Sequence, residues 1–160
     1  MAEGKGMRPR GRELALAILC HLESYAPAER AEAVGLVWNN PPAGDAEGED
    51  AFAVLAADGP ARRFAESLVA HVIARWSEID AAIEETSVRW RLARMDRVDR
   101  NVIRLAGAEL VALPDTPRGV IVAEAVRLAG RYGSERSVRF VNGLVEALAT
   151  RLRPNGASES

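Results

Sequence analysis

The sequence has few residues of the kinds that bind metals, form disulfides or act as nucleophiles. It contains one cysteine and two histidines among 160 residues. A single cysteine excludes an internal disulfide and is typical of a reducing, cytoplasmic setting. Cys20 and His21 are neighbours, so on a helix their side chains point roughly 100° apart and cannot converge on one ion. The sequence therefore predicts neither a metal site nor a bound cofactor.

Aromatic residues and long apolar runs are also scarce. Aromatics make up 5% of the chain, whereas hydrophobic residues make up 48%. This mixture favours closely packed helices over sheets, whose strands use more aromatic and β-branched residues. No apolar run is long enough to span a membrane, and residues 1–10 lack the apolar segment of a signal peptide. We therefore expect an all-α protein of the cytoplasm without a membrane segment.

Motifs for catalysis are missing as well. Neither Cys20 nor any serine has the local sequence of an activated nucleophile. The acids Glu84 and Glu85 are adjacent on a predicted helix and fit a solvated surface, and GKG at residues 4–6 is too short for a phosphate loop. His71 is interpreted as a packed or surface residue. The sequence does not predict an enzyme.

Helical periodicity is present over most of the chain. Apolar residues recur at three- and four-residue steps, separated by glycine, proline and polar breaks. Seven helices are predicted, at about residues 12–22, 28–38, 60–76, 77–88, 95–113, 117–133 and 134–152. The predicted organisation is a flexible basic arm over 1–10, one helical domain over 11–153, and a disordered tail over 154–160. An acidic loop is predicted at 39–60, with one short helix near Ala51 to Ala57.

Two of the predicted helix starts carry capping patterns. Ser77 precedes Asp80 by three residues, which resembles a capping box. Thr116 directly precedes Pro117, as expected for a cap followed by proline at the first helical position.

Charge is segregated along the chain although the net charge is only −2. Residues 1–12 carry four basic residues against one acid, a local charge of +3, and residues 43–58 carry five acids and no base. Residues 89–104 carry six arginines against two aspartates. Such blocks create local potentials that the net charge conceals. In the third block, acids at helical spacing from arginines favour a solvated face over an RNA or protein contact.

The N-terminal arm contains the first candidate RNA contacts. A flexible cationic arm gains affinity for a phosphate backbone by releasing counterions. An ordinary solubilising terminus is the alternative. Pro9 and Gly11 interrupt the run, which favours an arm over a continuous arginine helix. The candidate residues are Lys5, Arg8, Arg10 and Arg12.

The last predicted helix contains the second candidate, Arg139 with Phe140. The predicted core stripe of this helix is Val138, Val141, Val145 and Leu148. Phe140 falls outside that stripe, where an aromatic ring beside a cation can stack on an unpaired base. The alternative is that Phe140 packs on a second buried face together with Leu144 and Ala147.

Asn142-Gly143 is a strong turn dipeptide inside the same helix. The apolar period continues through it, so no turn is predicted. Gly143 costs the helix about 1 kcal/mol relative to alanine. We expect close helix packing at Gly143 to offset that cost, and Asn142 to bond a neighbouring segment or RNA.

Three stretches resemble the NusB transcription antitermination factors. MDRVDRNVIRLAGAEL at 95–110 and PDTPRGVIVAEAVRLAGRYGSERSVRFVNGLVEAL at 114–148 resemble their second half, and RPRGRELALAIL at 8–19 resembles their arginine-rich start. The resemblance implies an all-helical fold of two small bundles. It also implies an RNA-binding protein that pairs with the ribosomal protein NusE and recognises single-stranded boxA RNA in ribosomal RNA leaders. There the pair helps RNA polymerase read through terminators.

The resemblance also assigns roles to individual residues. The family's arginine-rich arm falls on Arg8, Arg10 and Arg12, and its basic-aromatic RNA contact falls on Arg139 and Phe140. Asn142 lies in the same signature. Asp99 and, with it, Arg104 fall on the helix that faces the protein partner.

The chain also departs from the family's pattern. Ala108 replaces a frequent tyrosine, Ala123 replaces a common asparagine, and Pro9 and Gly11 dilute the arm. These changes support an alternative, a helical protein-interaction module that lacks boxA-specific RNA binding, as a paralogue or a homodimer that hides the RNA face. NusB-like domains also precede ribosomal RNA cytosine methyltransferases. No cofactor motif of such an enzyme is present here, so we do not expect that activity.

Overall fold

The computed structural model describes residues 2–39 and 46–154, with side chains described from Gly6 and, in the second stretch, from Phe52. These residues form α-helices and short 3-10 turns, and no described residue lies in a strand. The predicted all-α class is confirmed, with eight α-helices in the described part where about seven were expected. They are α1 (Ala2–Leu22), α2 (Arg30–Asn39), α3 (Ala46–Ala57), α4 (Gly59–Ala74), α5 (Trp76–Thr86), α6 (Arg97–Ala112), α7 (Arg118–Tyr132) and α8 (Ser137–Leu152).

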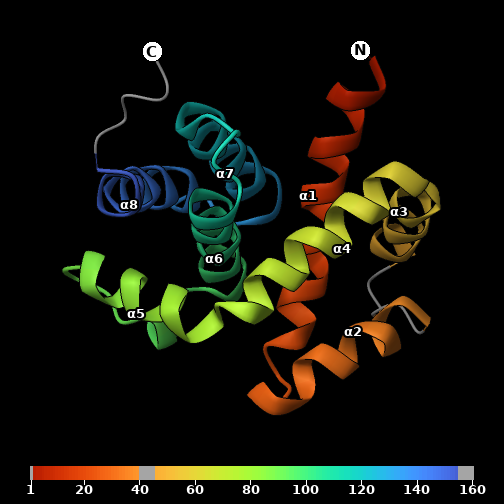
Figure 1. Ribbon diagram of the computed structural model, residues 1–160, viewed down its shortest axis with the longest axis horizontal. Helices are drawn as coiled ribbons and strands as arrows, with labels where there is room; N and C mark the ends of the chain where they lie inside the picture. Colours follow the sequence, from red (N-terminus) through yellow and green to blue (C-terminus); the bar gives the residue numbers. More distant parts are fainter. Residues whose placement is uncertain (1, 40–45, 155–160) are drawn as a thin grey trace. The chain divides into compact units, whose positions relative to one another are not determined.

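The chain divides into two compact units, residues 1–73 and residues 74–160. Helices α1 to α4 build the first unit and α5 to α8 build the second (Figure 1). None of the described helices combines the length and the apolar character needed to cross a membrane. Residues 40–45 of the predicted loop and 155–160 of the predicted tail lie outside the described residues.

Helix α1 begins at Ala2, so residues predicted as a flexible arm are helical through Pro9. Gly11, predicted to interrupt the arginine run, is instead the point where α1 meets α4. A Cβ atom at Gly11 would lie 2.7 Å from Phe64 Cδ2 and 2.9 Å from the Ala61 carbonyl oxygen. Only glycine allows the two backbones to approach this closely. This contact with α4 provides a physical reason for an ordered helix in place of an arm.

The segment predicted as an acidic loop contains α3, which begins five residues before the short helix expected there. Phe52 is only 7% exposed, and its ring centroid lies 5.9 Å from that of Trp38. Burial of Phe52 against the ring of Trp38 favours a packed helix despite the acidic composition. Asp58 follows α3 and accepts a hydrogen bond of 3.1 Å from the Ala61 N–H, which helps to cap α4.

In the second unit, α6 is the central helix, and α5, α7 and α8 all pack against it (Figure 1). Every residue from Asn101 to Leu110 is buried. The last carbonyl groups of α6 have no partner within the helix, and Arg153 supplies donors for several of them. Its guanidinium donates to the carbonyl oxygens of Leu110 at 2.9 Å and Leu113 at 2.8 Å, and also to that of Thr116. The residue after α8 thus closes the C-terminal end of α6.

Both predicted capping patterns are wrong. Helix α5 begins at Trp76 and has no side-chain cap, because the carboxylate of Asp80 is used in an ion pair with Arg104. Helix α7 begins at Arg118 with Pro117 at the cap position, again without a side-chain cap. At the start of α5, long-range pairing with α6 has taken the place of local capping.

Candidate nucleic-acid interface

The first turns of α8 carry the second predicted RNA contact on a solvent-facing side. Arg139 and Asn142 are exposed and Phe140 is partly exposed. The buried side of α8 consists of Ser137, Val141, Leu144, Val145, Leu148 and Ala149. Arg139 therefore lies on the exposed side of the first turn, about 100° around the helix from Phe140 and about 60° from Asn142. A cation and a partly exposed ring next to it are open to a ligand.

The predicted core stripe of α8 is wrong at its first position. Val138 is 41% exposed, and Ser137 is fully buried in its place. The Ser137 hydroxyl accepts a hydrogen bond of 2.9 Å from the Ser134 N–H, which fixes the entry into the helix. The alternative placement of Phe140 on a second buried face is only partly met, because Leu144 is buried while Ala147 is exposed.

The close packing expected at Gly143 is absent from the described structure. A Cβ atom at this position would meet no atom within 4 Å, so Gly143 faces open space. The cost of glycine in the middle of a helix, about 1 kcal/mol relative to alanine, is therefore not offset by intramolecular packing there. The open step at Gly143, as we call it, is a place beside Arg139 and Asn142 where the backbone of α8 faces open space without a side chain.

Asp99 supports this surface from beneath. It lies on α6, is 6% exposed, and accepts a hydrogen bond from Ser137 at the start of α8. Its Oδ1 atom has no hydrogen-bond partner among the described residues. Burial, reinforced by the negative charge of Asp96, raises the pKa of Asp99, although the Ser137 hydrogen bond opposes the shift. The predicted partner contact at Asp99 is thus a buried carboxylate under α8.

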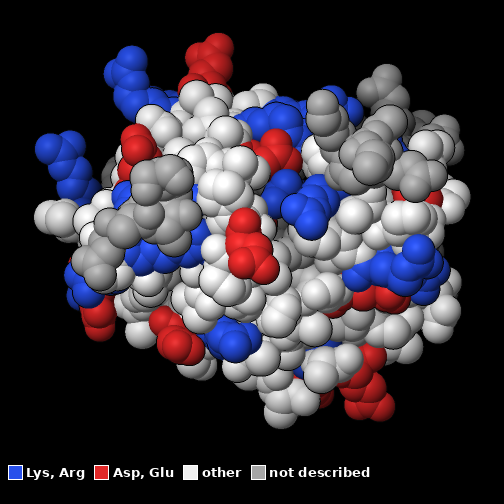
Figure 2. Space-filling model, turned by 45° about the horizontal axis from the view of Figure 1, so that its top comes forward, with Lys and Arg blue, Asp and Glu red and all other residues white. Residues whose placement is uncertain are grey.

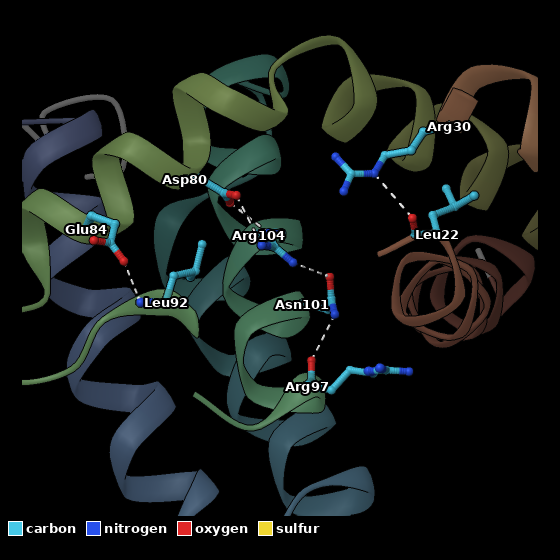
Figure 3. A network of polar contacts seen from close by, with 8 residues as sticks. All are labelled: Leu22, Arg30, Asp80, Glu84, Leu92, Arg97, Asn101 and Arg104. Atoms are coloured by element: carbon cyan, nitrogen blue, oxygen red, sulfur yellow. Dashed lines mark hydrogen bonds and ion pairs between the residues drawn. The ribbon is translucent and has the colours of Figure 1, made fainter. Parts of the chain in front are cut away.

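Arg104 also lies in the interior of the second unit. Its Nε donates to Asp80 Oδ1 at 2.7 Å, and its Nη1 donates to Asn101 Oδ1 at 3.0 Å (Figure 3). Asn101 in turn donates to the Arg97 carbonyl oxygen at 2.9 Å, and the Arg104 guanidinium lies 4.8 Å from the centroid of the Trp76 ring. With 7% of its side chain exposed, Arg104 uses its charge to hold α5 on α6 and does not offer it to a partner.

The arginines of the predicted arm fold onto the first unit. The guanidinium groups of Arg8 and Arg12 lie 5.8 Å and 5.5 Å from the centroid of the Phe64 ring. Arg12 is 3% exposed, so its guanidinium does not present a phosphate contact in this conformation. Arg10 is exposed, and its Nε donates to Asp58 at 2.8 Å. The side chain of Lys5 lies outside the described residues.

The sequence did not predict the two residues that these arginines contact, Phe64 and Asp58. Phe64 is one of several apolar residues on α4, and nothing in its local pattern distinguishes a ring that stacks with arginines. Asp58 belongs to the acidic block, so the opposite charges of the two blocks were the only available indication. Figure 2 shows positive and negative side chains intermixed on the face that it draws, without a broad area of one sign. On this face, binding of a polyanion would therefore depend on particular contacts.

Comparison with known proteins identifies the family of this chain. A model of the NusB family matches residues 9–150. The chain belongs to the NusB family. It is 43% identical over 150 residues to the transcription antitermination protein NusB of Sorangium cellulosum, covering 92% of this chain and 94% of that protein. Identity to the Myxococcus xanthus protein of the same name is 42% over 147 residues, covering 92% and 97% of the two chains.

Solved structures agree with the NusB assignment. T. maritima NusB is similar with a TM-score of 0.65 and 29% identity, covering 89% of this chain and 90% of that one. A crystal structure of the antitermination factors NusB and NusE in complex with double-stranded RNA contains a chain that is 26% identical, with a TM-score of 0.64. That match covers 91% of this chain and 97% of the other. The predicted family resemblance is therefore confirmed.

We predict that Gly143→Ala stabilises this NusB-family protein by up to about 1 kcal/mol, because the added Cβ meets no atom within 4 Å and alanine favours the helix. Urea unfolding followed by circular dichroism measures the change. Gly11→Ala is the matched comparison, since its Cβ would clash with Phe64 and Ala61 and should destabilise the protein. Equal losses in both variants would show that Gly143 is packed after all.

We predict that Asp99→Asn stabilises the protein at pH 7. Because burial raises the pKa of Asp99 above its unfolded value, the charged carboxylate lowers the stability of the folded state at neutral pH. That cost disappears as the pH falls through the raised pKa toward the unfolded value of about 4. Asparagine retains a carbonyl acceptor for Ser137, so the gain in unfolding free energy should be largest at pH 7 and shrink toward about pH 4.

Urea unfolding at several pH values measures this difference. The exposed Asp115→Asn serves as the control and should change stability by less than about 0.5 kcal/mol. A gain from Asp99→Asn that stays constant with pH, or a loss at pH 7, would contradict the role assigned to burial.

Proposed function

We propose that this protein is an RNA-binding transcription antitermination factor that acts together with NusE. The observation that carries the proposal is the exposed group of Arg139, Phe140 and Asn142 on α8, beside the open step at Gly143. An aromatic ring with a neighbouring cation can stack on an unpaired base and bind its phosphate. The names of the relatives, and the similar chain from a complex of NusB, NusE and RNA, support the same function.

The RNA that fits this surface is single-stranded, since stacking on Phe140 requires a base that is not paired. We propose boxA-type RNA of ribosomal RNA leaders as the target, bound in the cytoplasm while RNA polymerase reads through terminators. In this mechanism the protein is an adaptor without catalytic chemistry. It fixes the RNA and the second protein relative to the polymerase.

The first turns of α1 contribute to binding through two accessible arginines, Arg8 and Arg10. The ion pair between Arg10 and Asp58 is open to solvent, and pairs of this kind contribute little to stability. A phosphate group can therefore replace Asp58 at little cost. Arg12 contributes through its packing on Phe64, which orders the helix that carries the other two arginines.

Asp99 and Arg104 contribute indirectly. Asp99 fixes the start of α8 through Ser137, and Arg104 fixes α5 on α6 through Asp80. We propose that these two residues shape the surface that the protein partner contacts, without touching that partner themselves.

The expected affinity explains why a second protein is needed. About four phosphate contacts to a single strand give a salt slope of roughly −3, so a fourfold rise in salt weakens binding roughly fiftyfold. One stacked base adds about 1–3 kcal/mol. Such binding is modest at physiological salt, and sharing the RNA with NusE would raise it.

Titration of labelled boxA-type and scrambled RNA, followed by fluorescence anisotropy with and without NusE at two salt concentrations, tests the proposal. We expect Phe140→Ala to weaken boxA binding roughly 5- to 150-fold through the lost stacking. Arg139→Ala should weaken it and reduce the salt slope by about 1. Both variants should keep the helicity of the parent, since Arg139 is exposed and Phe140 is partly exposed.

Arg63→Ala, which removes an exposed arginine of α4, is the control and should bind like the parent. If boxA RNA is bound no better than scrambled RNA even with NusE present, RNA recognition is refuted. Binding of NusE that persists in that case would favour the alternative, a helical protein-interaction module.

A further inference from the structure

The loop at residues 87–91, between α5 and the turn that precedes α6, presents two large apolar side chains to solvent. Val88 is 96% exposed and Trp90 is 50% exposed. Burial of a tryptophan side chain is strongly favourable, and a half-exposed tryptophan gains only part of that free energy within its own chain. A ligand that covers the ring would supply the rest. Apolar groups that are exposed together often mark a site of interaction.

This loop is held in place at both ends. The Ser87 hydroxyl donates to the Trp90 carbonyl oxygen at 2.6 Å, and the Trp90 N–H donates to the Ser87 hydroxyl at 3.3 Å. The Glu84 carboxylate accepts from the Leu92 N–H (Figure 3) and from Arg91 Nη1 at 2.8 Å. These donors lower the pKa of Glu84, so it stays charged and keeps the loop closed. Trp90 is therefore displayed by an ordered loop, which reduces the entropy lost on binding.

The chemistry around Trp90 is cationic. Arg89 and Arg91 flank it in the sequence, and both are exposed. No described residue forms an ion pair with Arg89, whereas Arg91 shares its charge with Glu84. A hollow of about 240 Å³ beside the ring is lined by Glu84, Ser87, Val88, Arg89, Trp90 and Arg91. An aromatic face with adjacent guanidinium groups is the arrangement that binds a base and its phosphates.

The loop lies in the same unit as the Arg139–Phe140 surface, but near the opposite end of α8. Arg151 Nη1 donates to Glu85 Oε1 at 3.2 Å, which joins the end of α8 to the end of α5. Arg139 and Arg151 are twelve positions apart on α8, a separation of about 18 Å along the helix axis. A strand bound at Phe140 that follows α8 toward its C-terminal end would reach the neighbourhood of Trp90.

We infer that the loop at residues 87–91 is a second contact for single-stranded RNA, with Trp90 stacking on a base and Arg89 binding a flanking phosphate. This inference rests on the proposed function and extends it beyond the first turns of α8. A protein partner fits less well. The surface area of two apolar side chains is far smaller than the roughly 800 Å² that each partner buries in a stable interface. One stacked base needs only a single aromatic face.

The test uses the full chain and fluorescein-labelled single-stranded RNA of two kinds: a boxA element alone, and the same element extended by unpaired nucleotides at both ends. We expect Trp90→Ala to weaken binding of the extended RNA roughly 5- to 150-fold, and to leave binding of the short RNA unchanged. Trp90→Phe keeps a ring and should retain most of the affinity. Val120→Ala, which shortens an exposed apolar side chain on α7 outside the loop, should bind like the parent. RNA should quench tryptophan fluorescence in the parent, and this quenching should fall in Trp90→Phe.

The outcomes separate this inference from the proposed function. If the parent binds both RNAs and Phe140→Ala weakens that binding, but Trp90→Ala binds both like the parent, the loop contact is refuted and the function stands. Failure of the parent to bind either RNA refutes both. If Trp90→Ala and Val88→Ala weaken NusE binding and leave RNA binding unchanged, the loop is a protein contact and the inference is wrong. A loss of helicity in Trp90→Ala leaves the decision to Trp90→Phe, where unchanged quenching by extended RNA refutes the inference.

Discussion

Helix α6 is buried along its middle, and a helix in that position must find a partner within the protein for each polar group it carries. Arg104 meets this requirement with a two-point ion pair to Asp80, a hydrogen bond to Asn101, and the ring of Trp76. The carbonyl groups at the end of α6 meet it through Arg153. The packing of α5 on α6 depends on the contacts of Arg104, and the attachment of the C-terminal end of α8 to the end of α6 depends on those of Arg153.

The same constraint shapes the surface of α8. Its apolar side packs against α6 and α7, so Arg139, Asn142 and Gly143 are among the residues left exposed, and Phe140 is partly exposed. Asp99 joins the two helices through Ser137 and remains at a raised pKa, which makes it a costly group in the interior. The buried contact between Asp99 and Ser137 therefore helps to position the exposed residues at the start of α8. The proposed RNA contact depends on both groups.

Much of the fold could be predicted from the sequence because helical periodicity is a local property. The helices from α4 to α8 begin and end within a few residues of their predicted bounds. The pairing of side chains was not predictable in the same way. Asp80 resembles a cap in its own segment, and only the approach of α6 reveals it as the partner of Arg104. Local sequence likewise could not show that Gly11 is closely packed while Gly143 is open.

The candidate site was only partly predictable for the same reason. The position of Arg139 outside the apolar stripe of its helix correctly indicates an exposed side chain. The burial of Arg12 and Arg104 is visible only in the three-dimensional packing.

An NMR titration of the ¹⁵N-labelled protein with single-stranded boxA-type RNA tests the proposed RNA contact at the start of α8 most directly. We predict that the amide signals of residues 139–143 shift on binding, while those of the buried residues of α6 keep their positions. Shifts confined to other regions, with residues 139–143 unchanged, would contradict it.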